Sequence, residues 1–237
     1  SLGATWREAN WSWENRGEVR TADDSEKINL LSNAVGTIRQ GLALSGRLFA
    51  NRSDNVSGAE SRDGELRLGI AWRRLESRWI FFDRLDYGIE RERTSDNSRY
   101  ASWRLVNSLH ANVTPNRRTQ IALQAGLKYL QEQYDDRRYR GFTDLLGSEI
   151  RYDLTPSWDL GLHGQMLHSW SSGEMAWRSG LSVGHKVAKN AWVSLGYNLT
   201  GFYDDDFSRS DFTAQGPFIR FRFKFDQNSL KEILQQP

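Results

Sequence analysis

Apolar and polar residues alternate one by one through most of the chain, and this period of two is produced by β-strands with two different faces. The segment 218–225 is the clearest case, with Ile219, Phe221, Phe223 and Phe225 on one side and Arg220, Arg222 and Lys224 on the other. Segments 64–74, 119–133 and 192–203 follow the same pattern. The sequence therefore predicts an all-β protein whose strands each carry one apolar and one polar face.

The alternating segments predict about twelve strands in an up-and-down order. Tight turns, as at Gln40-Gly41 and 114–117, alternate with longer polar loops, as at 52–63 and 203–215. Tight turns at one end and long loops at the other are typical of transmembrane β-barrels of the outer membrane, in which the tight turns are periplasmic. An even strand count would leave both chain ends in the periplasm. The expected strands are 11–21, 27–39, 42–52, 64–74, 78–92, 100–113, 119–133, 142–154, 158–170, 174–187, 192–203 and 216–226.

The composition fits a membrane barrel better than a disordered or helical protein. Mean hydropathy is −0.69, yet 12% of the residues are aromatic and ten are Trp. Disordered chains are poor in aromatic residues, and no apolar run reaches the roughly 18 residues of a membrane-spanning helix. A barrel with an apolar lipid face and a polar lumen accounts for both observations.

Charge and cysteine content exclude other classes. Lys and Arg number 32 against 30 for Asp and Glu, so the net charge is +2, without the basic excess of a nucleic-acid binder. The absence of cysteine excludes disulfides and thiolate metal sites. We expect no nucleic-acid partner, no cofactor and no metal.

The face opposite the apolar one carries charges on strand after strand. A barrel of about twelve strands encloses a lumen too wide for apolar packing, and opposite charges on neighbouring strands can pair. We therefore expect these side chains to line a polar lumen. The alternative is a soluble β-sandwich, or two small barrels, with the apolar face turned inward. The expected lumen-lining residues are Arg16, Arg47, Arg67, Arg84, Arg104, Lys128, Glu149, Arg151, Arg178, Arg220 and Arg222.

Three local features add to this interpretation. Asp83 falls in an apolar register, so we expect a bulge there or a position near the membrane interface. The segment Leu2–Arg7 resembles Leu68–Arg73, which predicts the end of a further strand; chance similarity is the alternative. Six tryptophans near strand ends are expected to form interfacial girdles: Trp11, Trp79, Trp103, Trp158, Trp177 and Trp192.

The segment 215–225 resembles the terminal β-signal of bacterial outer-membrane proteins. The signal is a polar residue, a glycine and then alternating apolar residues, here Gly216, Phe221, Phe223 and Phe225. The resemblance implies insertion by the barrel-assembly machinery. In most such proteins the aromatic residue is the last one, whereas here 226–237 follow. The run 196–225 is similar to the C-terminal barrel of large multidomain bacterial envelope proteins.

These features predict one barrel domain and a short tail. Residues 1–226 are the barrel, of which 1–9 are either the end of a preceding strand or a periplasmic lead-in, and 227–237 are a periplasmic tail. The expected location is the outer membrane of a Gram-negative bacterium, with both termini periplasmic. Expected partners are outer-membrane lipid and lipopolysaccharide, the assembly machinery, and upstream domains or other envelope proteins.

Catalytic and metal-binding patterns are weak. His168-Ser169 is the one adjacent pair of the kind that outer-membrane phospholipases use, but it has no third member at a recognisable spacing. His110, His163 and His185 have no ligand spacing. The acidic run 203–206 offers oxygen ligands for Ca²⁺ without the spacing of a calcium loop. We expect no enzymatic activity.

Two functions remain open at this stage. The first is a membrane anchor or translocation module of a larger envelope protein. The second is a stand-alone, porin-like channel for small anionic solutes, because a basic lumen favours anions. If the lumen is open, changing Arg220 and Arg222 to Glu is expected to alter its ion selectivity.

Overall fold

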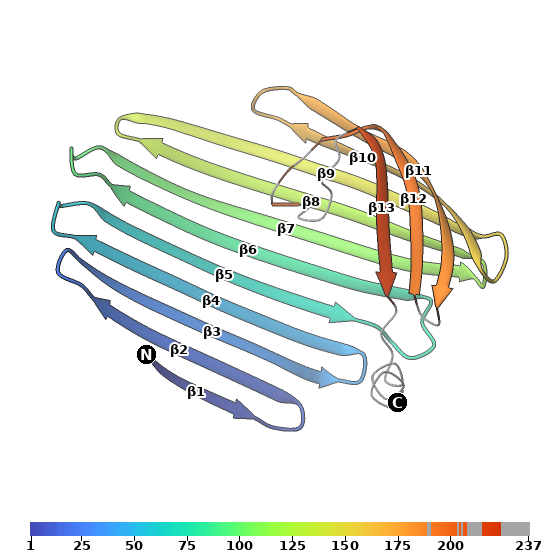
Figure 1. Cartoon of the computed structure of the whole chain (residues 1–237), viewed down its shortest axis with the longest axis horizontal. Coiled ribbons are helices and arrows are strands. Elements are labelled where there is room, and N and C mark those ends of the chain that lie inside the picture. Colours follow the sequence, from blue (N-terminus) through green and yellow to red (C-terminus); the bar gives the residue numbers. More distant parts are fainter. Residues whose placement is uncertain (189–190, 203, 205, 208–214, 224–237) are drawn as a thin grey trace. The chain divides into compact units, whose positions relative to one another are not determined.

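The protein forms one antiparallel sheet in which each strand pairs with its neighbours in the sequence. The computed structural model describes residues 1–188, 191–202, 204, 206–207 and 215–223. Within them the sheet has 13 strands in the order β1 to β13, and Figure 1 shows the strands following one another. The strands are β1 (Leu2–Arg7), β2 (Trp11–Thr21), β3 (Ser25–Arg39), β4 (Leu42–Asn55), β5 (Glu60–Trp72), β6 (Trp79–Arg93), β7 (Arg99–Asn116), β8 (Thr119–Tyr134), β9 (Arg137–Asp153), β10 (Trp158–Ser169), β11 (Met175–Ala188), β12 (Ala191–Thr200) and β13 (Gly216–Phe223).

The predicted all-β, up-and-down architecture is confirmed, with one strand more than expected. The additional strand is β1, whose residues pair with β2 from Leu2↔Gly17 to Arg7↔Ser12. Its apolar alternation is only six residues long, so the sequence pattern alone did not distinguish it from a chance match. With 13 strands, the parity argument that placed both chain ends on one side no longer applies.

The described residues contain no helix that is long and apolar enough to cross a membrane.

Of the two expectations for Asp83, a bulge or a position near the membrane interface, the bulge is wrong. The pairing of β5 with β6 runs without a register shift from Glu60↔Arg93 to Trp72↔Phe81. The carboxylate instead has a partner on the next strand, because the side-chain amide of Asn107 donates a hydrogen bond to Asp83 Oδ1 at 2.9 Å. A hydrogen-bonded pair lets a polar group stand in an apolar row at a lower cost.

The chain divides into two compact units. Unit 1 comprises Ser1–Ala111, Gln124–Leu145 and His168–Glu174, and unit 2 comprises Asn112–Leu123, Leu146–Leu167 and Met175–Pro237. Strands β1 to β6 belong wholly to unit 1, and β11 to β13 belong to unit 2. Strands β7 to β10 contribute residues to both.

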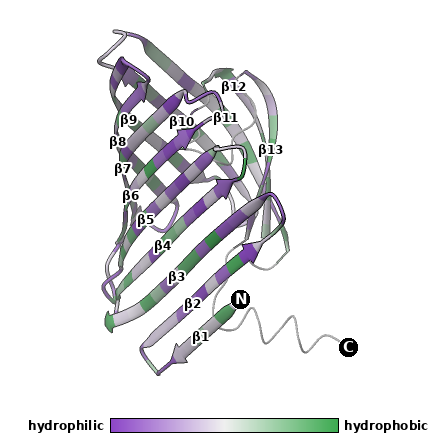
Figure 2. Cartoon of the chain, turned by 90° about the vertical axis from the view of Figure 1, so that its left-hand side faces the viewer, coloured by the Kyte–Doolittle hydropathy of each residue, from purple (hydrophilic) through white to green (hydrophobic). Residues whose placement is uncertain are grey.

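Burial is inverted with respect to a soluble protein. In unit 2 the side chains of Ser194 and Asn198 are fully buried, while Leu181 and Leu195 are 58% and 62% exposed. In unit 1, apolar and polar positions alternate along β2 to β5, as the hydropathy colours of Figure 2 show. Soluble proteins bury their large aliphatic residues first. Here the face with the crowded side chains is the polar one.

Glycines on the polar face of unit 2 make room for large neighbours. A Cβ atom on Gly180 would lie 2.6 Å from the His163 ring and 2.6 Å from the carbonyl oxygen of Tyr197. A Cβ on Gly196 would lie 2.3 Å from the Phe218 ring and 2.6 Å from the carbonyl oxygen of Leu181. The polar face is therefore filled by large side chains on one strand that cover glycines on the next.

We predict that Gly196→Ala lowers the free energy of unfolding by about 1–3 kcal/mol, because the added methyl group meets backbone that cannot move aside. Gly164→Ala is the matched control, since its Cβ would come no closer than 3.9 Å to another atom. Urea titration of the refolded chain, followed by tryptophan fluorescence, measures both. Equal stability of the two variants would contradict the close packing of the polar face.

Candidate functional site

The charged residues of unit 2 converge on its polar face into one connected cluster, which we call the polar network. Its members alternate with apolar residues along their strands and come from four different strands. The polar network consists of Glu149 and Arg151 on β9, Asp159 on β10, Ser194 on β12, and Arg220 and Arg222 on β13.

Asp159 is the centre of the network because each of its carboxylate oxygens binds a different guanidinium. Arg151 Nη1 donates to Asp159 Oδ1 at 3.0 Å, and Arg222 Nη2 donates to Asp159 Oδ2 at 2.6 Å. Gly184 lies beneath the carboxylate, and a Cβ there would come within 2.5 Å of Oδ1. The aspartate is thus held between two cations above a position that only glycine fits.

Glu149 extends the network to the last described strand. Its carboxylate lies 2.5 Å from Arg151 Nη2 and 3.1 Å from Arg220 Nη1. β9 and β13 are four positions apart in the sheet order, which in a flat sheet is a separation of about 19 Å. Side chains bridge that interval only if the sheet curls, so the polar face of unit 2 is concave.

The centre of the network is shielded from solvent. Asp159 is 4% exposed and Arg151 is 7% exposed. Buried charges are tolerated when they are paired and hydrogen-bonded, and removing one partner leaves the other charge uncompensated. Each carboxylate of the network contacts two guanidiniums, and Arg151 is shared between them, so every guanidinium of the network has a carboxylate partner.

Aromatic and amide groups complete the polar face of unit 2. His163 Nε2 lies 2.9 Å from Asn198 Oδ1, and the Phe218 ring lies edge-on to His163 at 5.8 Å between centroids. Trp192 lies within 6 Å of two cations, 5.6 Å from Lys186 Nζ and 5.9 Å from the Arg222 guanidinium. Trp192 thus faces the charged side chains, and the girdle position expected for it is wrong.

Unit 1 carries a second, more exposed group of charges. Arg67 bridges two carboxylates, with Nε 2.7 Å from Asp86 and Nη2 2.8 Å from Glu65. Arg84 Nε lies 2.8 Å from the other oxygen of Asp86. Arg47 stands directly opposite Arg67 across the β4–β5 pair. These residues share the face opposite to the exposed leucines of the same strands.

The remaining residues predicted to line a lumen also lie on polar positions. Arg16 is 3.9 Å from Glu18, and its side chain is 62% exposed. Arg104 packs against Gly88, Lys128 is half-buried on β8, and Arg178 is buried on β11. The structure brings Glu149, Arg151, Arg220 and Arg222 together in unit 2, and Arg47, Arg67 and Arg84 on neighbouring strands of unit 1.

The residues of the terminal motif lie on β13 as far as the structure describes them. Gly216 begins the strand with a φ of +122°, which favours glycine. Phe221 is 65% exposed on the apolar face. Phe223 is the last described residue of the strand, and Phe225 lies outside the described residues.

Asp159 is the member of the polar network at its centre, and the sequence did not single it out. It alternates with Trp158, Leu160 and Leu162, which places it on the polar face. The pattern carries no information on which arginines it meets, because those lie on β9 and β13. Only the curl of the sheet brings them together.

The candidate catalytic pair does not form a nucleophile–base arrangement. His168 Nδ1 lies 3.3 Å from Asp144 Oδ1, and the same oxygen accepts the indole N–H of Trp170 at 2.7 Å. Ser169 follows His168 on the strand, so the two side chains point to opposite faces. The His168 ring therefore contacts the Asp144 carboxylate and does not face the Ser169 hydroxyl.

Metal ligands are not gathered in the described part of the chain. No group of three or more His, Cys, Asp or Glu residues there is arranged to hold a metal ion. Within the acidic run, the backbone N–H of Asp206 donates to Asp204 Oδ1 at 3.0 Å. Tyr203 and Asp205 lie outside the described residues.

Several solved outer-membrane β-barrels share this fold. The siderophore receptor PirA from Pseudomonas aeruginosa matches 83% of the chain at 12% identity with a TM-score of 0.65, over 40% of the receptor. The ferric enterobactin receptor PfeA from the same organism matches 83% at 10% identity with a TM-score of 0.64, again over 40%. PirA from Acinetobacter baumannii matches 83% at 9% identity with a TM-score of 0.57, over 39%.

The chain thus spans about 40% of the length of the first two receptors. Identities this low establish a common fold and nothing further. No family model matches the sequence. No curated protein matches it either.

We predict that Asp159→Asn lowers the free energy of unfolding by about 3–5 kcal/mol, since Arg222 loses its carboxylate partner and the buried Arg151 keeps only Glu149. Asp54→Asn is the matched control, because Asp54 pairs with Arg52 at 2.7 Å but the Arg52 side chain is 52% exposed. That change is expected to cost about 1 kcal/mol or less. Urea titrations of the two variants compare them, and a small effect at Asp159 would contradict a stabilising role for the network.

Proposed function

We propose that the chain is an outer-membrane β-barrel segment that anchors, or translocates part of, a larger envelope protein. The observation that carries the proposal is the inverted burial, in which leucines such as Leu181 and Leu195 are exposed while Asn198 and Ser194 are buried. In water such a surface favours aggregation. In a bilayer the same surface contacts lipid, and the polar face is sequestered from it.

The anchoring role is supported by the way the polar face of unit 2 is filled. Arg220 and Arg222, which the sequence offered as determinants of ion selectivity, are engaged by Glu149 and Asp159. Each of the two arginines has a carboxylate partner, and Asp159 and Ser194 beside Arg222 are buried. Such a face serves to hold strands together better than to select solutes.

The proposed partners follow from the two faces and from the last strand. The apolar face would contact outer-membrane lipid and lipopolysaccharide. Gly216 and Phe221 on β13 fit the terminal signal through which the assembly machinery would insert the barrel. No catalytic step is proposed, because the His168 ring contacts Asp144 and Trp170 and the adjacent Ser169 stands on the opposite face of the strand.

The second candidate is a channel for small anions, and the exposed arginines of unit 1 favour it. The side chains of Arg16 and Arg84 are 62% and 43% exposed. Single-channel conductance in planar bilayers separates the two functions. An anchor is expected to insert without steady conductance. A channel is expected to conduct with anion preference, which Arg16→Glu together with Arg47→Glu would weaken.

We predict that Leu48→Arg lowers the free energy of unfolding in phospholipid vesicles by about 2–4 kcal/mol, the cost of arginine on a lipid-facing strand near the midplane. Leu48 lies mid-strand on β4 and is 42% exposed. Val56→Arg is the control, because Val56 lies in a turn and is 81% exposed. An exposed leucine in a soluble protein tolerates the change within about 0.5 kcal/mol. Equal, small effects at both positions would therefore argue against membrane insertion.

A further inference from the structure

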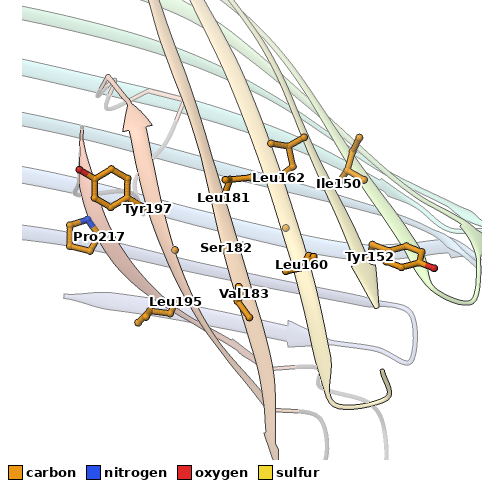
Figure 3. A pocket seen from close by; sticks show the side chains of 12 residues that line it. Ile150, Tyr152, Leu160, Leu162, Leu181, Ser182, Val183, Leu195, Tyr197 and Pro217 are labelled. Carbon is orange, nitrogen blue, oxygen red and sulfur yellow. The ribbon is translucent and has the colours of Figure 1, made fainter. Parts of the chain in front are cut away.

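The apolar face of unit 2 contains an open groove of about 740 Å³. Figure 3 shows its lining side chains, which come from β9 to β13. They are almost entirely aliphatic or aromatic, and most stand on exposed positions of the alternating strands. Among them are Tyr152, Leu160, Leu162, Leu181, Leu195 and Pro217.

Small residues contribute to the lining from the opposite register. Gly161, Ser182 and Gly196 occupy positions whose side chains belong to the polar face. Ser182 itself is 5% exposed and points toward Gly161 on that face. At these three positions the backbone forms the floor of the groove, and the larger side chains of the neighbouring residues form its walls. An extended hydrocarbon chain fits such a surface better than a compact solute does.

Beyond the groove, the same face continues toward the tight-turn ends of β10 and β11. Two residues beyond Leu160 and Val183, the rings of Trp158 and His185 lie 4.3 Å apart between centroids. Alternation places each ring on the face of its groove-lining neighbour. Trp and His combine an apolar body with a polar edge, which suits the boundary between hydrocarbon and headgroups.

An arginine pair lies in the turn next to this end of the apolar face. Arg117 and Arg118 are exposed in the turn between β7 and β8. The Asn116 side-chain oxygen accepts the backbone N–H groups of Arg118 and Thr119, each at 2.9 Å, and fixes the turn. The carbonyl oxygen of Arg118 accepts the N–H of Asp153 at 2.8 Å. Asp153 directly follows the groove-lining Tyr152, so the turn that carries both arginines adjoins that end of the groove.

We propose that this groove binds one acyl chain of an anionic phospholipid, with the phosphate headgroup held by Arg117 and Arg118. Charge complementarity selects this occupant, because guanidiniums bind phosphate oxygens in a bidentate manner. The inference rests on the proposed membrane insertion and adds a defined lipid site to it.

Native mass spectrometry of the full chain, delipidated in detergent and titrated with lipid, tests the site. We expect one dioleoylphosphatidylglycerol to bind at least about tenfold more tightly than dioleoylphosphatidylcholine, given the attraction of two arginines near the headgroup. Equal binding of the two lipids would overturn the proposal. So would the binding of many lipids with no saturating first site.

Paired variants assign the two halves of the site. Arg117→Gln with Arg118→Gln is expected to remove the preference for phosphatidylglycerol. The control, Arg73→Gln with Arg74→Gln at another exposed turn, is expected to keep that preference.

Leu181→Trp is expected to block binding of both lipids by filling the groove. The control, Leu199→Trp, lies exposed on β12 outside the groove and is expected to leave the binding of both lipids unchanged. Loss of preference in both arginine pairs, or equal binding by both tryptophan variants, would refute the assigned location.

Insertion of the same preparation into phosphatidylcholine vesicles is measured in parallel by protease protection. A chain that inserts but shows no preference for phosphatidylglycerol overturns the lipid site alone. A chain that does not insert overturns the proposed function and the lipid site together.

Discussion

The structure of unit 2 depends on a single carboxylate, Asp159, which accepts two guanidiniums from strands on either side of it in the sheet order. Without that charge, Arg222 would lose its carboxylate partner, and Arg151 would keep only Glu149. With it, contacts from Arg151 and Arg222 join β9 and β13 to β10 across the concave face. The curvature, in turn, buries the polar side chains and spreads the apolar ones outward.

This arrangement reverses the usual source of stability. In a soluble protein apolar burial drives folding, and paired charges contribute little at the surface. Here the leucines gain nothing from burial within the described chain, because they stand exposed on the opposite face. The polar face instead determines which side chains pack together. There Gly184, Gly180 and Gly196 each leave room for one side chain from a neighbouring strand. Packing and ion pairing therefore act on the same residues.

The sequence predicted local structure better than long-range contacts. Alternation located the strands and assigned residues such as Arg220 and Glu149 to the charged face, because a period of two is a local property. It did not predict that Asp159 centres the network, that Asn107 satisfies Asp83, or that Trp192 faces Lys186 and Arg222. Those pairings depend on register and on sheet curvature, which neighbouring residues do not encode.

The two faces of β13, the last described strand, contribute to different features of the chain. Its outward residues, Ile219 and Phe221, belong to the alternation that resembles an assembly signal, and its inward residues supply two of the three guanidiniums of the network. Without β13, Glu149 and Asp159 would share a single guanidinium of the network, that of Arg151. Docking of β13 brings the second and third cations. β13 thereby gives each carboxylate a guanidinium of its own, although the paired residues lie more than sixty positions apart in the sequence.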